Sequence, residues 1–156
     1  LPISVSGNTD FTTEGILDTT TTLGGAEAGA FDQAITKTDP AMVMMSLATY
    51  QSIDPNNPAV FSSTIIDGHI RNALKYTGVV ISDSMSAEAL SSYDVSQLGV
   101  KLVEAGGDMS CIGQTDYVKP IVDGLNERAK SDPAFASKVT AAATRVMTLK
   151  IKMGLA

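Results

Sequence analysis

The segment Gly78–Met85 constrains the fold more than any other part of the chain. Its sequence, Gly-Val-Val-Ile-Ser-Asp-Ser-Met, places three consecutive β-branched aliphatic residues behind a glycine. An apolar run without polar alternation predicts a short strand buried on both faces, as in a parallel sheet covered by helices. In such sheets, ligands and catalytic groups gather at the carboxyl ends of the strands. The carboxylate of Asp83 stands where the apolar run stops, so it is a candidate functional group.

Asp83 also has a purely structural interpretation. Aspartate is a preferred N-cap residue, and the loops between strands and helices are short. Asp83 can therefore cap a helix that runs through Ala87–Leu90. The spacing alone does not separate the two interpretations.

Two further apolar runs, Ala41–Ser46 and Asp108–Gly113, lie before and after this segment. Segments with helical periodicity separate the runs, and this alternation is typical of βαβ units with a parallel sheet. The sequence therefore predicts an α/β fold in which parallel strands alternate with helices. Helices are expected at 26–36, from Ser62 or Ser63 through Leu74, between Val95 and Val103, at 118–130, and from Val139 to Met153.

Length and composition set the broad class. The chain has 156 residues, of which 44% are hydrophobic, and this suits a single globular domain. We expect residues 1–24 to form an irregular, threonine-rich region beginning with a short strand at Leu1–Val5, and residues 25–156 to hold the βα units. A net charge of −6 with only 11 Lys and Arg argues against a nucleic-acid partner. No apolar run approaches the roughly 20 residues of a membrane span, and the first residues do not form a signal peptide.

Several residues are interpreted as structural. Cys111 is the one cysteine and lies within an apolar run, so it is expected in the core, as are most of the seven methionines. His69, the one histidine, is expected to be a surface or packing residue of a helix. The sequence contains no CxxC, HExxH or GxGxxG motif and no phosphate-binding loop. We therefore expect no metal and no cofactor.

Four segments together carry a resemblance to a known family. They are Pro40–Ser46, Pro58–Ser62 with Ile65, Ile66 and Arg71, Gly78–Asp83, and Ala105–Met109. Their order and spacing resemble the family 3 glycoside hydrolases, and in particular the bacterial β-N-acetylhexosaminidases, whose catalytic domain is a (β/α)8 barrel. The segment Arg145–Leu155 resembles the end of that domain. The resemblance extends from Phe31 to Leu155 and implies the C-terminal part of a TIM barrel.

The resemblance implies a retaining mechanism in which Asp83 attacks the anomeric carbon, with Ser82 able to support it by a hydrogen bond. A retaining glycosidase also needs an acid about 5 Å from the nucleophile. In this subgroup the acid/base is usually a histidine, paired with an aspartate, in a loop of the form Lys-His-Phe-Pro-Gly-His-Gly. This chain has Ser6–Asp10 in that region and no histidine there. It also has Leu47 where the subgroup commonly places a histidine, so the acid/base is missing or replaced.

A whole TIM barrel needs about 250 residues, so this chain corresponds to the last three or four βα units. Half a barrel leaves strand edges unpaired, and we expect completion by the N-terminal half or by a second copy. Two hypotheses follow: a partial β-N-acetylhexosaminidase acting on terminal N-acetylglucosamine, or a non-catalytic half-barrel that binds carbohydrate or assembles with other chains. For substrate binding we nominate Ser46, Ser62 and Met85. Cytoplasmic and bacterial cell-envelope locations, and a role in peptidoglycan recycling, both fit the family.

Overall fold

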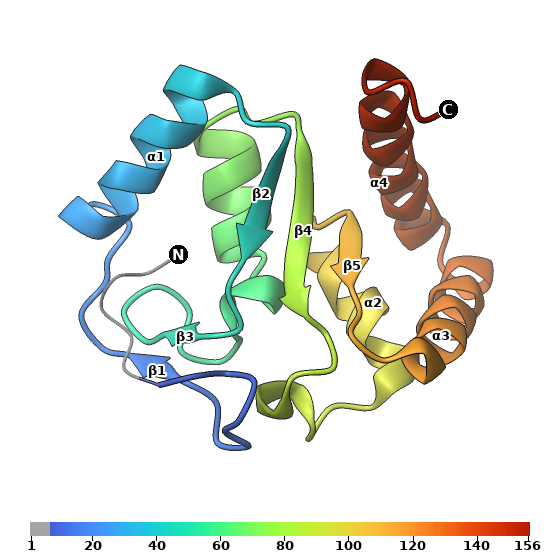
Figure 1. Ribbon diagram of the computed structural model, residues 1–156, viewed down its shortest axis with the longest axis horizontal. Coiled ribbons are helices and arrows are strands. Elements are labelled where there is room, and N and C mark those ends of the chain that lie inside the picture. The colour runs from blue at the N-terminus through green and yellow to red at the C-terminus, as the bar shows by residue number, and fades with distance from the viewer. Residues whose placement is uncertain (1–6) are drawn as a thin grey trace.

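The computed structural model describes residues 7–156, so the strand predicted at Leu1–Val5 lies outside the described residues. Its main sheet has three parallel strands, β2 (Met42–Met45), β4 (Val79–Ser84) and β5 (Met109–Cys111), in the order β2-β4-β5 (Figure 1). Each strand lies within one of the three predicted apolar runs. The predicted α/β fold with parallel strands and intervening helices is confirmed.

The helices overlap the predicted segments, but the last one begins at Pro133, before the expected Val139, because Asp132 caps it there. They are α1 (Ala26–Thr38), the π-helical segment η2 (Thr64–Ala73), α2 (Val95–Ala105), α3 (Val118–Ser131) and α4 (Pro133–Lys152), with short 3-10 turns η1 (Ala59–Phe61), η3 (Glu88–Leu90) and η4 (Thr115–Tyr117). The ends of α2 have local causes. The side chain of Asp94 accepts a hydrogen bond from the backbone N–H of Ser96, and Gly106 ends the helix at φ 104°, a conformation that favours glycine.

The core lies between the central strand β4 and the helices behind it. Val79 and Val80 point to opposite faces of the strand and are 1% and 0% exposed, so both faces are covered there. Ile66 from η2 and Leu98 from α2 are equally buried and belong, with Val80, to one hydrophobic cluster. Ile81 is half-buried. Of the three aliphatic residues predicted to be buried in this strand, only Val79 and Val80 are therefore buried.

The region predicted to be irregular contains one regular element. Strand β1 (Leu17–Asp18) pairs in parallel with β3 (Thr49–Tyr50) and forms a separate two-stranded sheet. The buried carboxylate of Asp18 accepts hydrogen bonds from the backbone N–H groups of Thr20 and Thr21, both 2.8 Å. The threonine-rich run is thus a turn held by Asp18, while residues 7–16 consist of turns and bends.

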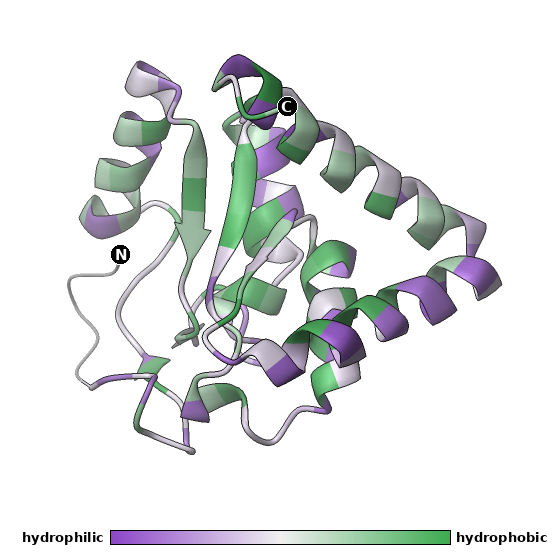
Figure 2. Ribbon diagram, turned by 45° about the vertical axis from the view of Figure 1, so that its right-hand side comes forward, coloured by the Kyte–Doolittle hydropathy of each residue, from purple (hydrophilic) through white to green (hydrophobic). Residues whose placement is uncertain are grey.

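Two predictions about burial are wrong. Cys111 is exposed and ends β5, which is an edge strand of the described sheet. Four methionines, Met42, Met44, Met147 and Met153, are 44–60% exposed. Met42 and Met44 lie on β2, the other edge strand, and the other two lie near the end of α4, where Figure 2 also shows hydrophobic residues.

A buried ionic network fixes the amino ends of the strands. The carboxylate of Asp108, which is 0% exposed, accepts hydrogen bonds from the Arg71 guanidinium, from Val80 N (2.8 Å) and from Arg145 Nε (2.8 Å). Arg71 also donates to the carbonyl oxygen of Gly78 at 2.7 Å. The network therefore joins η2, the start of β4, the start of β5 and α4.

Asp108→Asn is expected to destabilise the fold strongly. The substitution leaves two arginines around a neutral amide, and breaking a buried ion pair in this way costs about 3 kcal/mol. Urea unfolding at pH 7 measures the change in the free energy of unfolding. The control is Asp123→Asn, which removes an exposed i,i+4 pair with Lys119 and should leave the unfolding midpoint within error. Equal midpoints for both variants would contradict the assignment.

Candidate active site

Asp83 lies near the carboxyl end of the central strand β4, and its side chain is half-buried. Its Oδ1 atom accepts a hydrogen bond from the backbone N–H of Ser84 at 2.8 Å. Asp83 caps neither following helix, because Ala87 precedes the turn η3 and Asp94 caps α2. The structure therefore excludes Asp83 as a helix cap. The remaining interpretation is that Asp83 is a candidate functional carboxylate at the end of a strand.

The pairing of β4 with β5 is irregular at this point. Ile81 pairs with Met109 and Ser84 pairs with Cys111, so β4 has one residue more than β5 between the two pairs. This is a β-bulge, and it includes Ser82 and Asp83. The hydroxyl of Ser82 accepts a hydrogen bond from Cys111 N at 2.9 Å and is fully buried. The hydroxyl thus bonds to the neighbouring strand, whereas the sequence suggested a direct bond to Asp83.

Two loops lie beside each other at this end of the sheet. The backbone N–H of Ala89 donates to Thr9 O at 3.0 Å, and that of Glu88 donates to Asp10 O at 3.5 Å. The loop that contains Thr9 and Asp10 therefore contacts the segment that follows Asp83. This loop carries the exposed carboxylates of Asp10 and Glu14 and no histidine.

The three residues nominated for substrate binding have different environments. Ser46 is half-buried, accepts a hydrogen bond from Ala48 N at 3.0 Å and lines a pocket. Ser62 and Met85 are 0% and 1% exposed. Their side chains lie in the interior because Ser62 donates to Asp54 Oδ2 at 2.7 Å and Met85 packs in the core. Neither side chain is among those that line the pocket beside Ser46.

Asp54 is a buried polar residue that the sequence analysis did not select. Its carboxylate accepts hydrogen bonds from Ser62 Oγ, Asn57 Nδ2 and Asn56 N. Burial alone raises the pKa of Asp54, but these hydrogen bonds outweigh it and lower the pKa below its ordinary value. The signal in the sequence is the run Asp54-Pro-Asn-Asn-Pro, which is typical of a turn that an aspartate stabilises.

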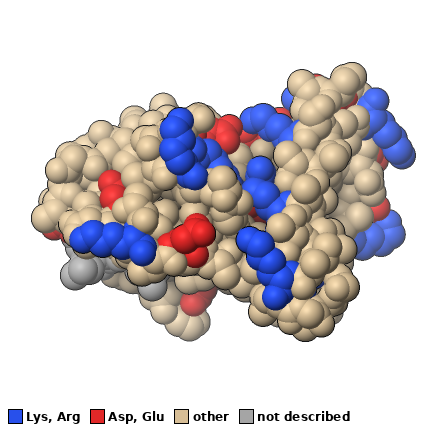
Figure 3. Space-filling model, turned by 90° about the horizontal axis from the view of Figure 1, so that it is seen from above, with Lys and Arg blue, Asp and Glu red and all other residues tan. Residues whose placement is uncertain are grey.

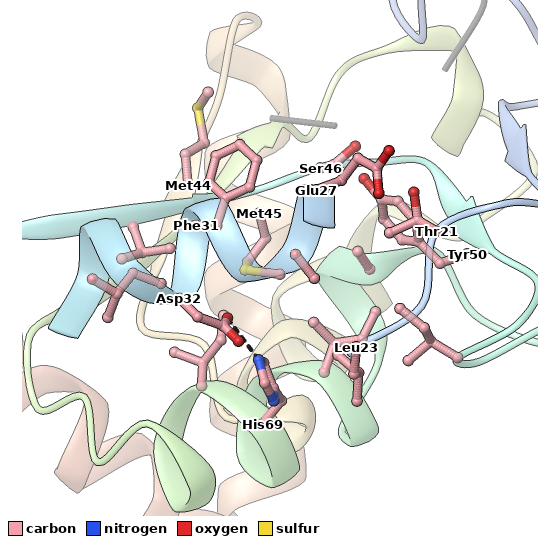
Figure 4. A pocket seen from close by; sticks show the side chains of 17 residues that line it. Thr21, Leu23, Glu27, Phe31, Asp32, Met44, Met45, Ser46, Tyr50 and His69 are labelled. Atoms are coloured by element: carbon pink, nitrogen blue, oxygen red, sulfur yellow. Dashed lines mark hydrogen bonds and ion pairs between the residues drawn. The ribbon is translucent and has the colours of Figure 1, made fainter. Parts of the chain in front are cut away.

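A pocket of about 130 Å³ lies between α1, β2 and η2, and Asp83 is not part of its lining (Figure 4). Most of the lining is apolar, including Leu23, Phe31 and Met45. His69 Nε2 lies 2.8 Å from Asp32 Oδ1, and this pair joins η2 to α1 within the pocket. His69 thus occupies a packing position on a helix, as the sequence suggested, away from the strand end that carries Asp83.

Among residues 7–156, no group of three or more His, Cys, Asp or Glu side chains is placed to hold a metal ion. Within the same range, no helix is both long enough and apolar enough to cross a membrane.

The parallel βα units, with a carboxylate near the end of their central strand, define part of a barrel whose site lies at the carboxyl rim. Residues 6–149 match the family described as the glycosyl hydrolase family 3 N terminal domain. The chain belongs to this family.

Individual relatives agree with this assignment. A β-N-acetylhexosaminidase from Beutenbergia cavernae is 35% identical, with a TM-score of 0.86, over 94% of this chain and 44% of that enzyme. A family 3 β-N-acetylglucosaminidase from a Paenibacillus species shares the fold at 24% identity and a TM-score of 0.84, over 97% of this chain and 29% of that one. An uncharacterized secreted glycosyl hydrolase from Arthroderma benhamiae is 36% identical over 69 residues, 44% of this chain and 20% of that protein. The chain spans less than half the length of each.

Asp54→Asn is expected to destabilise the protein in a pH-dependent way. A carboxylate whose pKa is lowered by folding stabilises the fold above its unfolded pKa, near 3.8, and loses this contribution as the pH falls through the folded pKa. The variant should lose about 2 kcal/mol at pH 7, since hydrogen bonds to a charged group are replaced. Urea unfolding at pH 7 and pH 3 should show a smaller difference at pH 3. A difference that is independent of pH would rule out the charged form as the cause.

Proposed function

We propose that this chain is the part of a retaining family 3 β-N-acetylhexosaminidase that carries the catalytic nucleophile, Asp83. The observation that carries the proposal is the position of Asp83 near the carboxyl end of the central strand, on the rim where barrel enzymes hold their catalytic groups. The 35% identity to the Beutenbergia cavernae enzyme over 94% of this chain supports the same reaction class.

In the proposed reaction, Asp83 attacks the anomeric carbon of a terminal β-linked N-acetylglucosamine. A carboxylate oxygen forms a covalent bond to that carbon while the bond to the leaving oxygen breaks, and an acid protonates the leaving oxygen. Water, deprotonated by the same group, then displaces Asp83 and releases the sugar with retained configuration. The bond from Ser84 N–H to Oδ1 holds the carboxylate in one orientation and leaves Oδ2 as the attacking atom.

No single residue is identified as the acid/base of this reaction. The loop beside Asp83 has no histidine, and Leu47, which is 2% exposed, replaces the histidine common after the serine of this strand. We therefore propose that the acid/base comes from outside the described residues or from a carboxylate of the loop. A partner that supplies the remaining barrel strands is part of the proposal.

The sheet supports such completion. Both edge strands, β2 and β5, have only β4 as a neighbour within the described sheet. Met42 and Met44 are exposed on β2, and unpaired strands with exposed apolar residues favour pairing with another chain. The N-terminal half of a barrel and a second copy of this chain are the two candidate partners.

A non-catalytic half-barrel that binds carbohydrate or assembles with other chains is the second candidate function. It is favoured by the missing acid/base histidine and by the separation of Asp83 from the apolar pocket near α1. In that case Asp83 binds a sugar hydroxyl and forms no covalent bond.

The test is hydrolysis of a chromogenic β-N-acetylglucosaminide, with the molar mass of the same sample measured by light scattering. We expect hydrolysis by an assembled species and a loss of at least about 10³-fold in Asp83→Asn, because the nucleophile is removed. The matched control is Asp116→Asn, an exposed carboxylate after the neighbouring strand β5, which should keep full activity.

Two outcomes would contradict the enzyme proposal. One is full activity in Asp83→Asn. The other is no activity from a folded wild-type chain even after the N-terminal half of a family 3 barrel has been added. The second outcome, together with retained binding of N-acetylglucosamine, would support the half-barrel binding module.

A further inference from the structure

We infer that Ser82 is a positioning residue for Asp83, and that it acts by closing the β-bulge that contains both residues. The inference rests on the proposed function, since it concerns how the proposed nucleophile is oriented. It starts from one irregularity: between the pairs Ile81–Met109 and Ser84–Cys111, β4 contains one residue more than β5.

A bulge changes the direction in which side chains leave a strand and weakens the local pairing. Along a regular strand, side chains alternate between the two faces, so an extra residue shifts the alternation for all that follows. Asp83 is one of the two β4 residues inside the bulge, and it lies between the buried Ser82 and the half-buried Ser84. The direction of the Asp83 side chain therefore depends on how firmly the bulge is held.

The hydroxyl of Ser82 is placed to hold the bulge. It is fully buried and accepts the hydrogen bond from Cys111 N at 2.9 Å, so a side-chain atom of β4 bonds to the backbone of β5. On the far side of Asp83, Met85 N donates to Cys111 O at 2.8 Å. Cys111 thus bonds to Ser82 before Asp83 and to Met85 after it, and the Ser82 hydroxyl supplies one of the two bonds.

Another serine gives a matched control. The hydroxyl of Ser86 also accepts a hydrogen bond from a backbone N–H beyond β5, that of Gly113, at 3.2 Å. Ser86 lies after the bulge and bonds to no atom of Cys111 or Asp83 in the described contacts, although its hydroxyl also lies 3.1 Å from that of Ser84. Ser86→Ala therefore removes a bond of the same kind from the same segment without opening the bulge.

The test uses NMR on the whole chain and needs no turnover. In Ser82→Ala, amide hydrogen exchange at Cys111 should accelerate by roughly tenfold, because one hydrogen bond is lost. The amide proton of Ser84, which donates to Asp83 Oδ1, should shift toward its position in Asp83→Ala, where that acceptor is absent. Ser86→Ala should leave the exchange at Cys111 unchanged; it serves as a control for that signal alone, because the Ser86 hydroxyl contacts that of Ser84.

Two results would overturn the inference. Unchanged exchange at Cys111 would show that the Ser82 bond does not hold the bulge. Faster exchange at Cys111 with the Ser84 amide at its wild-type position would make Ser82 structural only. If Ser82→Ala does not fold, Ser82→Cys serves instead, since it keeps a similar volume but offers only a weak acceptor. In an active assembly, Ser82→Ala should lower kcat with little change in KM, whereas failure of the proposed function would leave the NMR results intact.

Discussion

The parallel pairing of β4 with both of its neighbours is the constraint on which the rest of the structure depends. Because parallel strands must be joined by crossovers, every connection between β2, β4 and β5 has to leave the sheet and return, and η2 and α2 are those connections. The two ends of β4 are then held differently. The Asp108 network fixes the amino end with ionic hydrogen bonds, whereas a bulge closed by the Ser82 hydroxyl fixes the carboxyl end. The ionic interactions that stabilise the sheet thus lie at the amino end of β4, and the proposed chemistry lies at its carboxyl end, as in barrel enzymes generally.

The distribution of charge follows the same division. Figure 3 looks onto the molecule from the amino ends of β2 and β4, and basic side chains gather on this face. The exposed carboxylates in the loop beside Asp83 and in the segments after β4 and β5 are Asp10, Glu14, Glu88, Asp94 and Asp116, and one exposed cation, Lys119, follows Asp116. An acidic rim repels anionic polymers and leaves neutral sugars unaffected. A neutral N-acetylated sugar therefore suits the proposed site better than a phosphorylated or uronic acid substrate.

The sequence predicted the elements better than their environment. The alternation of apolar runs and helical segments is a local pattern, and the strands and helices follow it closely. The exposure of Cys111 and Met44 was not predictable in this way, because it depends on which strands lie at the edges of the sheet. Asp83 was selected because it ends an apolar run. The bulge that contains Asp83 was not predicted. A bulge depends on how two strands pair, and the sequence of one strand alone does not indicate it.

The separation of Asp83 from the apolar pocket has a consequence for how the proposed enzyme selects its sugar. Among the described residues, Asp83, the proposed nucleophile, is flanked by the loop before β1 and by the segments that follow β4 and β5. A complete barrel surrounds its site with eight such loops, and the groups that recognise a substrate are spread over them. Attack at an anomeric carbon is common to all retaining glycosidases, so Asp83 by itself confers little selectivity. In the proposed assembly, the partner at the open edges of the sheet therefore sets which sugar is bound, while this chain supplies the attacking carboxylate and holds its direction.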